Sequence, residues 1–74
     1  MPWLHITGWR HGMEKDATVE VLRAHLGLGR SEATGLADAI LDGHELRLEV
    51  DADVAVEELA AALRELGVDA TAEA

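Results

Sequence analysis

The chain has 74 residues, enough for one small domain, and a domain of this size buries only about 60% of the surface that its unfolded chain exposes. It has no cysteine, which excludes disulfides and thiolate chemistry, and it has no apolar stretch of membrane-spanning length. The net charge is −9, and all of it arises after Ala37, where eleven acids outnumber two bases, Arg47 and Arg64. Without cysteine or a long apolar stretch, we expect a cytoplasmic protein with no membrane partner. Because the acidic half of the chain repels phosphate backbones, we also expect no nucleic-acid partner.

The first predicted element is a strand at residues 2–9, because apolar and polar residues alternate there. A period of two places Leu4, Ile6 and Gly8 on one face. The opposite face is then expected to carry the other side chains of this strand, namely Trp3, His5, Thr7 and Trp9. A short loop at residues 10–13 follows.

Two helices are predicted next, joined by the segment Gly27-Leu28-Gly29. Asp16 is a suitable N-cap for the first helix, which should end near residue 25. Gly27 is expected to end that helix with a positive φ, and Gly29 to occupy the N-cap of the second. Leu26 and Leu28 should hold this turn against the core. The apolar residues of the two helices recur at helical spacing, at positions 19, 22 and 26 and at 33, 36, 37, 40 and 41.

The second half is predicted to contain a strand, a helix and a strand. Residues 45–50 alternate strictly and predict a half-buried strand. Asp51 and Asp53 are expected to open a helix over residues 54–66, which Gly67 ends, and residues 68–73 predict a last strand. The order β-α-α-β-α-β favours an α+β two-layer sandwich. Its three-stranded antiparallel sheet should have the first strand in the centre and all three helices on one face.

Two families resemble this chain at the level of short motifs. Gly27-Leu28-Gly29 with Glu32-Ala33, and residues 59–67, are similar to the C-terminal domain of the bacterial ribosomal stalk protein, which recruits translation GTPases. Residues 19–22 with Leu26-Gly27-Leu28 and residues 32–34 also resemble ClpS, the Clp protease adaptor, which has the same topology. Both resemblances imply one fold and a protein partner such as the ribosome, a GTPase or a protease component.

The stalk resemblance implies that basic residues of the helical hairpin bind the partner, and Lys15, Arg23 and Arg30 are the basic residues there. The ClpS resemblance implies an adaptor without the usual site for a client's amino terminus, because the two places that would form it hold residues 7–10 and Ile40 or Leu41.

No residue pattern indicates catalysis, a cofactor or a metal. The four histidines show no H-x-x-x-H spacing, Gly27-x-Gly29 lacks the third glycine of a dinucleotide motif, and Ser31 has no histidine placed to activate it. We therefore expect a non-enzymatic protein-interaction module. Trp3 and Trp9 are further candidates for partner binding or for a weak homodimer through the open face of the sheet. The alternative is an acidic regulator, of the antitoxin or nucleic-acid-mimic kind, that binds a basic partner.

Overall fold

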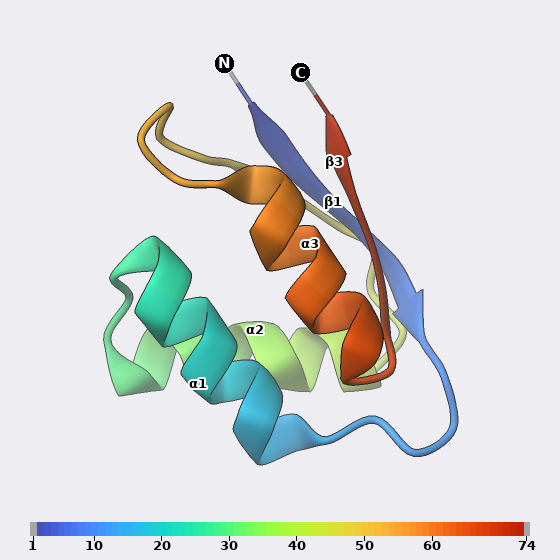
Figure 1. Cartoon of the computed structure of the whole chain (residues 1–74). Helices are drawn as coiled ribbons and strands as arrows, with labels where there is room; N and C mark the ends of the chain where they lie inside the picture. The colour runs from blue at the N-terminus through green and yellow to red at the C-terminus, as the bar shows by residue number, and fades with distance from the viewer. Residues whose placement is uncertain (1, 74) are drawn as a thin grey trace.

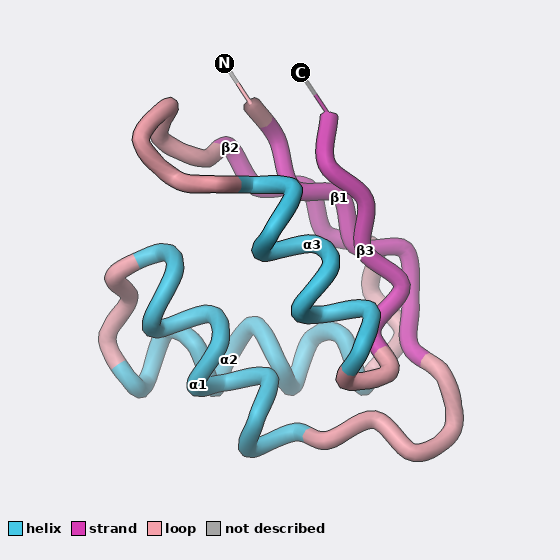
Figure 2. Tube along the Cα trace, viewed as in Figure 1, coloured by secondary structure: helices cyan, strands magenta, loops and turns pink. Residues whose placement is uncertain are grey.

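The computed structural model describes residues 2–73, which form three strands and three helices. In chain order these are β1 (Trp3–Trp9), α1 (Lys15–Leu26), α2 (Arg30–Leu41), β2 (Leu46–Glu49), α3 (Val56–Glu65) and β3 (Val68–Glu73). Figure 1 shows the three helices on one side of the sheet. The same arrangement is seen in Figure 2, where the strands form a layer of their own.

The sheet has the order β2-β1-β3, and β1 pairs antiparallel with both neighbours. In the register, Leu4 lies opposite Leu48 on one side and Ala72 on the other. Facing residues point to the same side of a sheet, so the apolar positions of the three strands meet under the helices. The predicted α+β architecture with a central first strand is confirmed.

The core lies between the sheet and the helices, and most of it comes from the predicted apolar positions. The fully or nearly fully buried large side chains are Leu4, Ile6, Val19, Leu22, Ile40, Val50, Leu59, Leu63 and Val68. One polar residue, Thr18, is also fully buried. Its hydroxyl donates to the carbonyl oxygen of Glu14 at 2.7 Å, so the buried oxygen atom is satisfied within the first turn of α1.

The glycine positions of the hairpin are confirmed, and two of the predicted helix starts are wrong. Gly27 ends α1 with a φ of 67°, and Gly29 is the N-cap of α2. Asp16 is not an N-cap: α1 begins at Lys15 after Glu14, and Asp16 lies inside the first turn. In that position its negative charge still interacts favourably with the helix dipole.

The start of α3, unlike that of α1, is later than predicted. Asp51 and Asp53 lie in the loop before the helix, and the N-cap is Ala55. The amide of Val54 donates to the carbonyl of Asp51 at 3.0 Å. This bond closes a turn ahead of the helix, which delays the first helical residue to Val56.

A β-bulge in β1 changes which face the end of that strand presents. Ile6 pairs with Ala70, but Gly8 pairs with Asp69, so Thr7 is an extra residue against β3. A Cβ on Gly8 would lie 4.0 Å from the carboxylate of Asp69, which puts Gly8 on the open face. Trp9 then lies opposite Val68, which is fully buried on the helix side.

The prediction that Trp9 shares the open face with Trp3 is therefore wrong. The alternation of the sequence assumed a regular strand, and the bulge inverts it for the last two residues of β1. Trp9 lies at the strand end with 41% of its surface exposed, and Trp3 alone remains among the polar side chains of the open face.

Candidate protein-interaction surfaces

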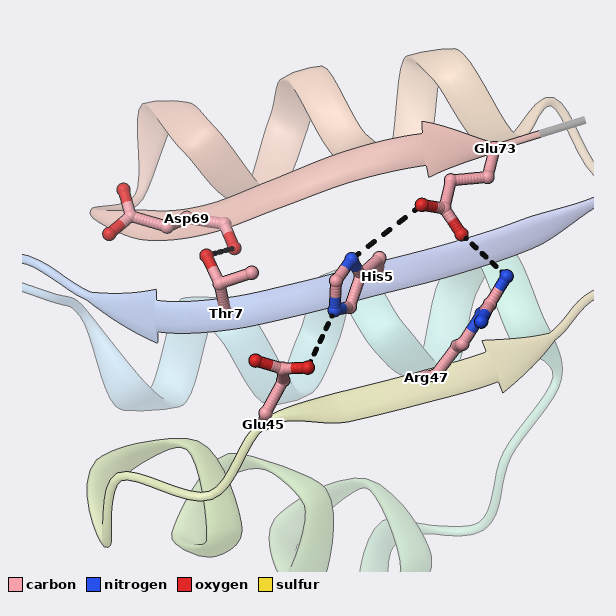
Figure 3. Close-up of polar contacts among 6 residues, drawn as sticks. All are labelled: His5, Thr7, Glu45, Arg47, Asp69 and Glu73. Carbon is pink, nitrogen blue, oxygen red and sulfur yellow. Dashed lines mark hydrogen bonds and ion pairs between the residues drawn. The ribbon is translucent and has the colours of Figure 1, made fainter.

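The open sheet face, which no helix covers, carries a polar network around His5 (Figure 3). The His5 Nε2 atom lies 3.1 Å from a carboxylate oxygen of Glu45, and Nδ1 lies 3.7 Å from a carboxylate oxygen of Glu73. The other oxygen of Glu73 is 3.0 Å from the guanidinium of Arg47. One histidine and one glutamate on adjacent strands thus link all three strands.

Trp3 joins this network through a cation–π contact. The guanidinium carbon of Arg47 lies 5.2 Å from the centre of a Trp3 ring, within the distance at which such pairs attract. Arg47 therefore covers part of the aromatic surface that was expected to bind a partner. The open face is mainly a charged surface with one half-buried indole.

The two carboxylate contacts of His5 also bear on metal binding. Its two ring nitrogens face carboxylates on opposite sides, so the imidazole and the acids do not converge on one point. Among residues 2–73 the structure has no group of three or more histidine or acidic side chains that could hold a metal ion.

Near the C-terminal end of β1, two arginines connect the segments around the turn between α3 and β3. Arg10 lies 3.3 Å from a carboxylate oxygen of Asp69 and also donates to the carbonyl of Arg64. Arg64 in turn donates to the carbonyl of Ala70 at 2.8 Å. The hydroxyl of Thr7 donates to the carbonyl of Asp69, so the extra residue of the bulge is held as well. Sequence patterns gave no sign of these structural roles.

The predicted basic residues of the helical hairpin are only partly free. Lys15 of α1 pairs with Asp38 of α2 at 2.5 Å, and the Asp38 carboxylate raises the pKa of Lys15 above its usual 10.5 by hydrogen bonding and charge. Arg23 lies 3.5 Å from Glu20. Within residues 2–73 the structure shows no ion pair for Arg30. Lys15 and Arg30 line one hollow of about 290 Å³, and Arg23 does not.

One surface was missed by the sequence reasoning. At the end of the molecule where the α1–α2 turn meets the segment after β2, an apolar hollow of about 180 Å³ opens to solvent. We call it the leucine groove, and its apolar lining is Leu26, Leu28, Leu36, Leu48, Val50 and Val54. Five of these residues were predicted on apolar faces or in the turn, and Val54 was predicted at the start of a helix. Their sequence spacing gave no sign that they meet at an opening.

Comparison with protein-family models, with curated proteins and with solved structures finds no match for this chain. None of the helices within residues 2–73 is both long and apolar enough to cross a membrane.

Proposed function

We propose that this chain is a non-enzymatic protein-interaction module that binds its partner through exposed charge. The observation that carries this proposal is that most cations are paired within the chain, whereas the acids of one segment are not. Four of the six cations pair with acids of the same chain, and Arg64 is bound to a carbonyl. By contrast, five exposed acids on the segment between Arg47 and Arg64 form no ion pair within residues 2–73: Glu49, Asp51, Asp53, Glu57 and Glu58.

An acidic surface without internal ion pairs favours binding of a partner that has a basic surface. Complementary charge speeds association and selects against acidic proteins and nucleic acid. In this version of the proposal the chain is an acidic regulator, of the antitoxin or nucleic-acid-mimic kind, that occupies the basic site of another protein.

A second candidate is a divergent relative of the ribosomal stalk domain or of ClpS. Its support is the β-α-α-β-α-β order with a central β1, which both resemblances imply. Arg30 is the basic hairpin residue most available for an acidic partner. Lys15 and Arg23 would exchange their present acids for those of the partner, and exposed pairs of this kind contribute only about 0–1 kcal/mol. The partner would then be a ribosomal component, a translation GTPase or a protease component.

Two charge variants with the same number of substitutions separate these versions. One is Asp51→Asn/Asp53→Asn/Glu58→Gln, and the other is Lys15→Gln/Arg23→Gln/Arg30→Gln. Each immobilised chain is exposed to a lysate of the source cell, and the retained proteins are quantified by mass spectrometry. We expect a basic protein that the parent and the hairpin variant retain and the acid variant loses.

The reverse pattern, with an acidic protein lost by the hairpin variant alone, would favour the stalk-like version. If no protein depends on either set of charges, the proposal of charge-based binding is wrong.

A further inference from the structure

We propose that the leucine groove is a docking site for a basic amphipathic helix of the partner protein. The inference rests on the proposed function and names the site and the chemistry of its occupant. The leucines of the groove differ from those of the core in their exposure. Leu4, Leu22 and Leu63 are completely buried, whereas Leu26, Leu28 and Leu36 remain partly exposed although the fold packs them against the same core.

The shape of the groove fits a side chain. Leu26 is the last residue of α1, Leu28 lies in the α1–α2 turn and Leu36 lies in α2. Leu48 comes from β2, and Val54 from the loop after it. In Figure 1 that loop and that turn lie at the same end of the molecule. An apolar cavity of about 150 Å³ can hold benzene. A groove of about 180 Å³ therefore has room for one large apolar side chain.

The rim of the groove is acidic. Glu49 and Asp51 belong to its lining, and Asp53 is an exposed residue of the same loop. No lysine or arginine belongs to the lining, and none occurs in the sequence between Arg47 and Arg64. An occupant therefore needs an apolar anchor with positive charges beside it.

The rim charge decides among the possible occupants. A second copy of this chain carries a net charge of −9, and an anionic membrane or a nucleic acid is also negative, so all three would meet like charge. In a helix with leucines at positions i and i+4, lysines at the neighbouring positions lie within one turn of each leucine. This geometry brings an apolar side chain into the groove and a cation to the rim at once, which is the helix-in-groove mode of recognition.

A pair of synthetic peptides tests the proposal. Both are 14-residue peptides of seven leucines and seven lysines; one has leucines at helical spacing, and the other strictly alternates. Binding to the full chain is followed by ¹⁵N NMR at low and at physiological salt. We expect chemical-shift changes centred on Leu28, Leu36 and Leu48, binding of the helical peptide about tenfold tighter than of the alternating one, and about tenfold weaker binding at the higher salt.

Matched variants locate the binding site. Asp51→Asn/Asp53→Asn should weaken binding of the helical peptide several-fold, and Asp42→Asn/Glu65→Gln, which removes the same charge from exposed positions outside the groove lining, should not. Leu28→Gln lies in the turn rather than in a helix, so it should reduce binding while the NMR spectrum stays that of a folded protein.

Three results would overturn the groove proposal: equal affinity for the two peptides, equal effects of the two acid variants, or shift changes centred on His5 and Arg47. Concentration-dependent shifts at the groove without any peptide would instead identify a second copy as its occupant. None of these outcomes touches the lysate experiment, in which partner binding depends on the exposed charges wherever they lie. Failure of the groove and failure of the proposed function are therefore separate results.

Discussion

Two glycines at helix ends have left-handed backbone angles but very different surroundings. Gly27 has a φ of 67°, and a Cβ added there would meet no atom within 4 Å. Gly67 has a φ of 93°, and its added Cβ would lie 3.0 Å from Cα of Met13 and 3.2 Å from its backbone nitrogen. At Gly27 a side chain costs backbone strain alone. At Gly67 the segment before α1 must also move.

We therefore expect Gly67→Ala to destabilise the fold more than Gly27→Ala. The strain at Gly27 should cost about 1–2 kcal/mol, and Gly67→Ala should exceed that value because of the clash with Met13. Gly35→Ala is the matched control, since Gly35 lies inside α2 with nothing within 4 Å of an added Cβ, and it should stabilise by about 0.5–1 kcal/mol. Urea unfolding of the three variants measures the order, and equal losses for Gly27→Ala and Gly67→Ala would contradict it.

Among the elements, the contact between Lys15 and Asp38 ties α1 to α2 and gives the hairpin a pH dependence. The pKa of Lys15 is higher in the folded chain than its ordinary 10.5, because Asp38 stabilises the ammonium. A raised pKa means that the folded state holds this proton more tightly than the unfolded state does. The stabilisation is therefore complete below pH 10.5 and is lost as the pH rises through the higher folded value.

The stability difference between Asp38→Asn and the parent should therefore depend on pH. Both side chains are largely exposed, so the loss at neutral pH should be small. The difference in melting temperature should shrink above pH 10.5 as Lys15 loses its proton. In a Lys15→Arg background the same difference should persist, because the guanidinium stays charged. A constant difference in the parent background would show that the pair does not link the helices.

For the whole molecule, the open sheet face decides how two copies could associate. The sequence predicted four indoles across a two-fold contact, but the bulge in β1 leaves only Trp3 of each copy on that face. Two half-buried indoles would contribute about 5 kcal/mol at roughly 25 cal/mol/Å², against an association cost of about 4–15 kcal/mol. The acids and the arginine beside Trp3 are already paired within one copy.

We therefore expect a monomer at micromolar concentration, and self-association only towards the millimolar range. Sedimentation equilibrium over this range measures it. Trp3→Ser should remove any association, whereas Trp9→Ser should leave it unchanged because Trp9 lies opposite Val68 on the other face. A dimer at micromolar concentration, or one that Trp9→Ser abolishes, would assign the contact to a different surface.

Local signals were enough to predict most of the fold. The period-two and helical patterns, the stop at Gly27 and the short connections determine the order of elements, and with it the central position of β1. These signals act between residues a few positions apart, or through general rules of chain connection, so the sequence contains them directly.

Tertiary structure alone decided the surfaces. The face of Trp9 depends on a bulge at Thr7, whose partner, Asp69, is 62 residues away in the chain. The availability of Lys15 depends on Asp38 in another helix. The leucine groove exists because Leu28 and Leu48 meet at one end of the molecule. Such contacts follow from strand register and helix packing, which the composition and spacing of single segments do not contain.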